Sequence, residues 1–155
     1  MGTSKDADFI APAIMCQSFA VELLLKFFLV VDHPAAKSVD DLKTAGVNLR
    51  CHKYSELFDQ LTQATKGKIA NTYAAVSGKQ TDAAGFRNAL IAQGDDPFVY
   101  WRYIYEKSGY SHFNWHDFSL VTLALGKTAE AERQAAPNAQ VQDGPARPGV
   151  YLESR

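Results

Sequence analysis

The stretch from Asp96 to Phe118 gathers most of the side chains of this protein that are suited to binding a ligand. It contains nine of the eighteen aromatic residues of the chain, together with Arg102, His112 and His116. Exposed aromatic rings beside basic side chains can stack on nucleic-acid bases, and a planar guanidinium can bind a phosphate or carboxylate through parallel hydrogen bonds. The same rings can also form part of a core, so their placement on a helix decides between these uses.

Helical geometry places most of these rings on one side. A helix is predicted from Pro97 to about Lys107, because Asp96 is a good N-cap and proline suits the position after it. Tyr100 and Tyr103 face outward on a helical wheel, where they could stack on a base. The apolar stripe consists of Phe98, Trp101, Ile104 and Tyr105. The stretch is therefore predicted to be mostly core.

Arg102 has two interpretations. It lies at the edge of the apolar stripe, four residues before Glu106, so an ion pair with Glu106 or with Glu22 of the first helix is the structural one. In the functional interpretation, the Arg102 guanidinium binds a phosphate or a carboxylate through two parallel hydrogen bonds. Tyr103 beside it is then a second candidate binding residue.

His112 and His116 are four residues apart, and Asp117 follows the second of them, which suggests a metal site. Two histidines at this spacing share a face only when both are helical. Gly109 and the predicted helix cap Asn114 place His112 in a loop, and no other His or Cys cluster lies nearby in the sequence. We therefore predict no metal site, and a loop or cap role for both histidines.

The overall charge gives no general attraction to nucleic acid. The 155 residues include 16 basic and 17 acidic side chains, for a formal net charge of −1. A contact with RNA or with a nucleotide would therefore need a local basic patch. The acid-free basic segment of the chain contains Lys43, Arg50 and Lys53, in a predicted loop where small charge clusters are usually solvated.

The sequence favours a cytoplasmic protein. Cys16 and Cys51 lie far apart and outside any Cys-x-x-Cys pattern, which is typical of two reduced thiols. The chain begins without a secretion signal. Its most apolar run is interrupted by Glu22 and Lys26 and is shorter than the ~20 apolar residues of a membrane span. We expect a soluble protein without a membrane segment, and no cofactor is indicated.

Helical patterns dominate, and no convincing strand alternation appears. The first helix is predicted from about Pro12 to Val31, with Pro12 in its first turn. Ser18, Glu22 and Lys26 form one narrow polar wedge and apolar residues cover most of the rest. Such a helix lies at the centre of a fold or is half covered by a second subunit. Further helices are predicted over about 53–61, 63–76, 82–93, 97–107 and 115–133, with a helical turn near 38–45.

The domain organisation is simple. Residues 1–133 are predicted to form one helical domain. Residues 134–155 hold three of the six prolines and few apolar residues, which predicts a flexible tail rich in Pro, Gly, Gln and Ala.

Four segments of the chain follow one another in the order and spacing of a known family. The first helix, "AVELLLKFFL", is similar to an A-x-E-x-x-x-K first helix, and "CHKYSELFDQL" is similar to the start of the second helix in that family. "DPFVYWRYIYE" looks like the F-x-x-W-R-Y-x-Y-E helix of some small bacterial members, and "NWHDFSLVTLAL" like their terminal helix. Together these segments resemble HEPN domains, and the resemblance spans about residues 10–126. It implies an all-α up-and-down bundle of four to five helices, often paired as a homodimer.

The resemblance also suggests a biological setting. Proteins of this family commonly act in prokaryotic defence, toxin–antitoxin and RNA-processing systems, and many are metal-independent ribonucleases. The nuclease members carry Arg-x4–6-His, in which an imidazole and a guanidinium act on a 2′-hydroxyl and its phosphate. No Arg and His of this chain have that spacing: Arg102 and His112 have nine residues between them, and "RNALIA", from Arg87, has Ala92 where the histidine belongs.

We therefore expect a HEPN-like domain that does not cleave RNA, but dimerises and binds a nucleic acid, a nucleotide or a protein partner. One alternative is a ribonuclease in which Arg102 and His112 meet across a dimer. Another is a pure protein-interaction scaffold. The resemblance implies that His52 caps or orients the start of the second helix, with ligand binding beside Arg50 and Lys53 as the alternative.

Overall fold

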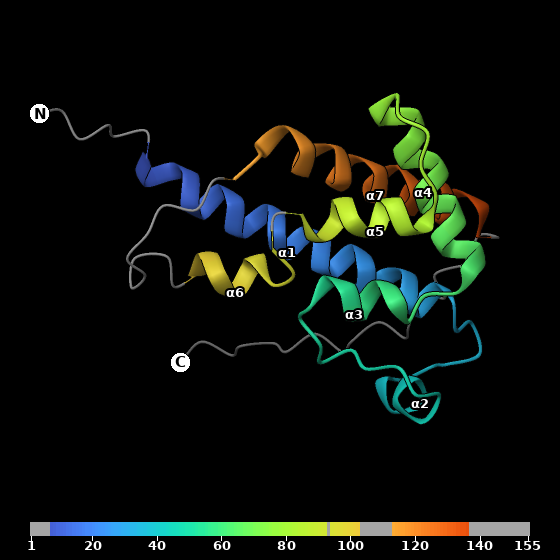
Figure 1. Ribbon diagram of the computed structural model, residues 1–155. Coiled ribbons are helices and arrows are strands. Elements are labelled where there is room, and N and C mark those ends of the chain that lie inside the picture. Colours follow the sequence, from blue (N-terminus) through green and yellow to red (C-terminus); the bar gives the residue numbers. More distant parts are fainter. Residues whose placement is uncertain (1–6, 93, 103–112, 137–155) are drawn as a thin grey trace, which may run out of the picture.

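The computed structural model describes residues 7–92, 94–102 and 113–136, and this part of the chain is all-α (Figure 1). It contains seven helices and no strand. They are α1 (Ala7–Val31), α2 (Val39–Thr44), α3 (Tyr54–Asp59), α4 (Gln63–Ser77), α5 (Ala83–Ile91), α6 (Pro97–Arg102) and α7 (Trp115–Ala135). The all-α prediction is confirmed. The resemblance implied four to five helices, and the described part has seven. Three of these, α2, α3 and α6, are short, with six residues each in the described part.

The longest helix, α1, lies along the length of the molecule, with α3 and α6 on one side of it (Figure 1). It packs against α3, α6 and α7, while α7 also packs closely on α4. Pro12 was predicted in the first turn, but the helix begins at Ala7, so Pro12 lies inside it. The prediction of the start was wrong because a proline within the early turns of a helix removes one hydrogen bond without ending the helix.

Side-chain caps define the starts of several helices. The Oδ1 atom of Asn114 accepts a hydrogen bond from the Asp117 N–H at 3.1 Å, as predicted. The Oγ1 atom of Thr62 accepts from the Thr65 N–H at 3.3 Å and caps the start of α4 in the same way. The predicted turn near residues 38–45 is a full helix, α2, with a capping box at its start.

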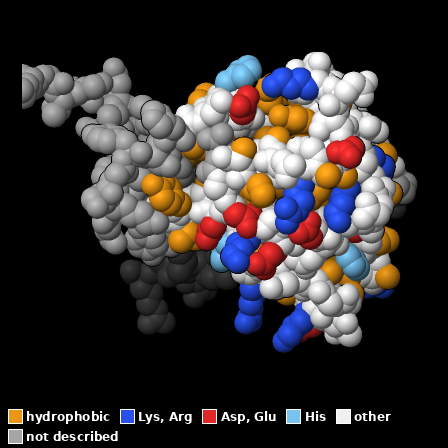
Figure 2. Space-filling view, viewed as in Figure 1, with side chains coloured by type: hydrophobic (Ala, Val, Ile, Leu, Met, Phe, Trp, Pro, Cys, Tyr) orange, Lys and Arg blue, Asp and Glu red, His pale blue; other side chains and the backbone are white. Residues whose placement is uncertain are grey.

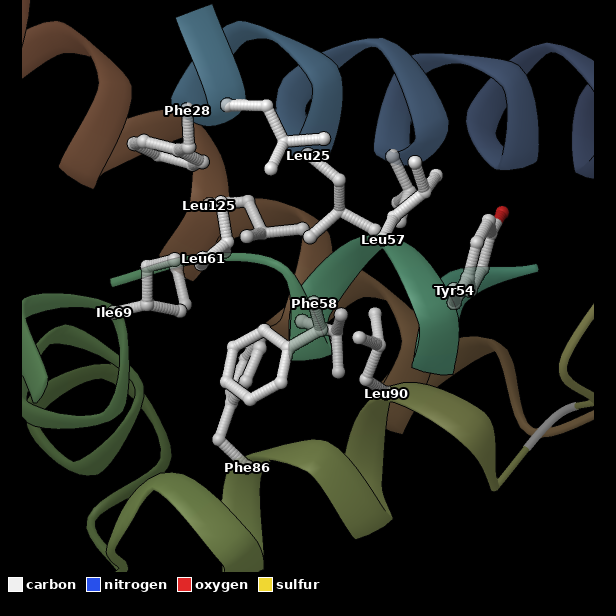
Figure 3. Close-up of a cluster of buried hydrophobic side chains, with 14 of the residues drawn as sticks. Leu25, Phe28, Tyr54, Leu57, Phe58, Leu61, Ile69, Phe86, Leu90 and Leu125 are labelled. Atoms are coloured by element: carbon white, nitrogen blue, oxygen red, sulfur yellow. The ribbon is translucent and has the colours of Figure 1, made fainter. Parts of the chain in front are cut away.

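The main core lies between α1, α3, α4, α5 and α7 (Figure 3). Leu25 and Phe28 of α1 point toward the side chains of α3 and α7 in this view. Phe86 of α5 is fully buried, and its ring centroid lies 5.4 Å from that of Phe58 in α3 and 5.3 Å from that of Tyr73 in α4. These three rings join three helices at one point.

The aromatic stretch is only partly described. Phe98 is half-buried, and its ring lies 5.4 Å from that of Phe19 in α1. Tyr100 was predicted to face outward, but it is half-buried and packs against Ile14, because α6 lies along the N-terminal half of α1. The side chain of Trp101 and all of Tyr105 lie outside the described residues. The predicted tail does too, except that α7 extends to Ala135, past the predicted boundary at residue 133.

Candidate functional site

The helix α1 is oriented so that its polar wedge faces inward. Ser18 and Glu22 are buried, and the Lys26 side chain is 20% exposed. Between Pro12 and Val31, where the side chains of this helix are described, the most exposed large residues are apolar: Phe19, Leu23, Phe27 and Val30. A surface helix of a single subunit normally turns its polar side to solvent and its apolar side to the core. Both faces of α1 are therefore candidates for function.

Glu22 is the centre of the polar side. Its Oε1 atom accepts a hydrogen bond from the Lys26 ammonium at 2.7 Å and lies 3.0 Å from Nδ1 of His52. The Glu22 side chain is only 2% exposed, whereas that of His52 is 54% exposed. Lys26 lies one helical turn after Glu22, and His52 comes from the segment before α3. The cluster thus connects α1 to a part of the chain that is thirty residues away.

Three buried polar atoms near this cluster have no hydrogen-bond partner within the described part of the chain: Oγ of Ser18, Oε2 of Glu22 and Oδ1 of Asp96. Tyr54 lies among them and donates its hydroxyl proton to the Ser18 carbonyl oxygen at 2.6 Å. Burial is the main cause that raises the pKa of Tyr54, and the nearby Glu22 and Asp96 carboxylates raise it further. Tyr54 therefore stays protonated at physiological pH and acts as a hydrogen-bond donor; Figure 3 shows its hydroxyl directed toward α1.

The start of α3 is capped by Asp95 and not by His52, which was predicted to cap or orient it. The backbone N–H of Tyr54 donates to the Asp95 carbonyl oxygen at 2.8 Å, and the Ser55 N–H donates to the Asp95 carboxylate at 2.7 Å. Asp95 therefore caps α3 from 40 residues away, whereas His52 contacts Glu22 instead. Asp95 was not predicted as a cap, because a cap from a distant segment has no local sequence pattern.

One member of the predicted basic segment, Lys53, is paired with an acidic side chain. The Lys53 ammonium lies 3.0 Å from Oε1 of Glu56, and this hydrogen bond raises the pKa of Lys53. Hydrogen bonds from the Cys51 thiol and from Lys53 lower the pKa of Glu56, so this acid is ionised beside the segment. Arg50 is exposed. Figure 2 shows Lys or Arg and Asp or Glu side chains interspersed on the visible face, without a broad basic patch.

The candidate catalytic pair cannot be placed. Tyr103 and His112 lie outside the described residues, and so does the side chain of Arg102, whose backbone ends α6. Arg87, which begins the motif-like "RNALIA", binds the Asp59 carboxylate through Nε and Nη2, at 2.8 Å each. This two-pronged hydrogen bond lowers the pKa of Asp59. Arg87 therefore links α5 to α3.

No group of three or more His, Cys, Asp or Glu side chains within the described residues is arranged to hold a metal ion. His116 is exposed at the start of α7. Cys16 and Cys51 are both free thiols. Burial is the main cause that raises the pKa of Cys51, which keeps this thiol protonated and unreactive.

The apolar side of α1 is a continuous stripe. We define the α1 stripe as Phe19, Leu23, Phe27 and Val30, which are between 36% and 49% exposed. At 100° per residue these four side chains fall within about 80° of the helix circumference. Cys16 is exposed at the N-terminal end of the same arc. Contiguous apolar surface of this kind is typical of sites that bind another protein or a membrane.

The length of α1 also meets the requirement for a membrane span. Residues Pro12–Val31 have a mean hydropathy of 2.0, and 39% of this window is buried inside the protein. A core helix satisfies the same two criteria, so they do not distinguish the two cases. Two contacts attach α1 to the rest of the domain: Glu22 Oε1 lies 3.0 Å from Nδ1 of His52, and the Gln17 amide donates a hydrogen bond to Thr122 of α7 at 2.8 Å.

Comparison of this chain with protein-family models, with curated proteins and with solved structures gave no match. The site is therefore interpreted from its own residues.

Proposed function

We propose that this protein is a HEPN-like helical bundle that functions as a homodimer and acts by binding a partner, without cleaving RNA, in a prokaryotic stress, toxin–antitoxin or defence setting. The observation that supports the proposal best is that α1 buries Glu22 together with an apolar face that includes Leu25 and Phe28, and still leaves the α1 stripe exposed. A second copy of the chain would cover that stripe.

The polar cluster supports the relation to HEPN domains. Glu22 and Lys26 are the polar residues of the A-x-E-x-x-x-K pattern, and His52 is the histidine of the second-helix pattern. These residues were matched separately along the chain, yet they meet around one carboxylate oxygen. The joint contact of Glu22, Lys26 and His52 gives a structural reason for these residue types at these positions.

The homodimer is tested by light scattering of the wild-type protein over a range of concentrations. We expect the mass of two chains at high micromolar concentration and a decrease toward one chain on dilution. A mass of one chain throughout this range would contradict the homodimer.

The absence of RNA cleavage is tested with single-stranded RNA and three proteins: wild type, Arg102→Ala and His112→Ala. We expect equal background from all three, because the Arg-x4–6-His couple that supplies the general base is missing from the sequence. Cleavage by the wild type that falls at least about 100-fold in both variants would establish the ribonuclease alternative instead.

RNA binding as such is a separate question that the same samples can answer. Phosphate contacts release counterions, so an affinity that depends on them must weaken as salt increases. A titration with RNA at two salt concentrations therefore tests whether the protein recognises the phosphates of RNA. Affinity for RNA that does not change with salt would count against recognition of its phosphates.

A further inference from the structure

We infer that the homodimer forms through an antiparallel pair of α1 helices, with Leu23 of each subunit on the two-fold axis. This inference rests on the homodimer proposed above. It specifies the surface that the second subunit covers and the register of the two α1 helices. It is carried by the spacing and exposure of the apolar residues on α1.

The α1 stripe has the same spacing in both directions. Phe19 and Phe27 lie four residues before and after Leu23, and Cys16 and Val30 lie seven residues before and after it. Leu23, at the centre, is also the most exposed member of the stripe, at 49%. The arrangement is therefore symmetric about one residue.

This symmetry is what an antiparallel two-fold interface requires. In such an interface a surface pairs with itself, and residues at equal distances on opposite sides of the axis meet. With the axis at Leu23, Phe19 packs against the partner's Phe27, and Cys16 lies near Val30 of the partner subunit. Every apolar residue then meets another one. A parallel pair would place each residue beside its own copy and would need no symmetry within the stripe.

Charge and shape agree with this pairing. The α1 stripe contains no charged residue, and Lys26 at its edge is already bound to Glu22. Phe19, Leu23 and Phe27 form a row at four-residue spacing, which is the ridge that commonly packs into the groove of a facing helix. Antiparallel helices also align their dipoles favourably.

The available area predicts a dimer of modest affinity. For side chains of about 150–200 Å², the exposed fractions of the α1 stripe correspond to roughly 300 Å² of apolar surface. A stable interface buries about 800 Å² from each partner. The stripe can thus form the apolar centre of the interface. The remainder must come from a polar rim, so dissociation in the micromolar range is expected.

The interface is tested by Leu23→Asp, with Val39→Asp as the matched control because Val39 is an exposed apolar residue on α2. Two carboxylates would meet at the axis, so we expect the dimer dissociation constant to rise by at least about 30-fold, a central-residue effect. The control should dimerise like the wild type. If Leu23→Asp still dimerises like the wild type, while the wild type is a dimer, the homodimer stands and the α1 interface is wrong.

The register is tested by thiol cross-linking with a short bifunctional maleimide, so that the test does not depend on Leu23→Asp. Val30→Cys should link to Cys16 of the partner subunit and yield a covalent dimer on a denaturing gel. Wild type should not, because 14 residues of helix separate the two Cys16 thiols by about 21 Å along the axis. Val39→Cys is the control for random collision. Strong cross-linking of wild type through Cys16, with none added by Val30→Cys, would overturn the antiparallel register in favour of a parallel one.

A lipid surface is the other occupant to be distinguished. The same wild-type and Leu23→Asp proteins are floated with vesicles of phosphatidylcholine and phosphatidylglycerol. We expect neither protein to float. Flotation of the wild type that is lost in Leu23→Asp would assign the α1 stripe to the membrane and overturn the dimer interface.

Discussion

Phe86→Ala is expected to lower the free energy of unfolding by about 4 kcal/mol, the largest effect that we predict for a single substitution in this protein. The ring of Phe86 is fully buried and contacts the rings of Phe58 and Tyr73. Its removal leaves a cavity where α3, α4 and α5 meet, and these helices cannot close it without losing their other contacts. Urea denaturation followed by circular dichroism measures the change.

Phe86→Leu is the matched variant for this prediction. Leucine keeps most of the buried volume, so the expected loss is below about 1.5 kcal/mol. Equal losses for the two variants would show that the contact between the aromatic rings, and not the filled volume, stabilises this part of the core.

Lys26→Met is expected to lower the free energy of unfolding by about 3 kcal/mol. Methionine retains the apolar length of the lysine but removes the ammonium, which leaves the buried Glu22 carboxylate with His52 as its remaining partner. The cost comes from a buried charge without its counter-ion. The measurement is again urea denaturation at neutral pH.

Two further variants isolate the cause. Lys68→Met makes the same change at the more exposed pair of Lys68 with Glu132, and it should cost less than about 1 kcal/mol. Adding Glu22→Gln to Lys26→Met removes the buried charge itself, so the double variant should regain most of the lost stability. A double variant as unstable as Lys26→Met, or less stable, would contradict the explanation by an uncompensated carboxylate.

The two faces of α1 connect stability to the proposed function. The Glu22 cluster requires the polar wedge to face inward, and this orientation turns Phe19, Leu23 and Phe27 outward. A sequence that only needed a stable single subunit would place polar residues at those exposed positions. We therefore regard the buried cluster and the α1 stripe as parts of one arrangement, in which the internal polar contacts set the direction of the external apolar surface.

Local sequence patterns determined much of the secondary structure. Periodic apolar residues and capping residues such as Thr62 and Asn114 act within one or two helical turns, so the chain near them is sufficient to recognise the helix. The all-α class follows from these patterns alone. The position of Pro12 was misjudged because proline is compatible both with the first turn and with a nearby interior position, and its neighbours do not distinguish the two.

The tertiary structure alone decided how these helices face one another. Helical periodicity identified the wedge of Ser18, Glu22 and Lys26, but not whether it points to solvent or to the core. That choice depends on His52, Tyr54 and their positions in space. The cap of α3 by Asp95 likewise depends on a segment 40 residues away. Contacts between distant segments are set by the packing of the whole domain, so a local pattern carries no information about them, and the exposed apolar surface of α1 became visible only in the folded chain.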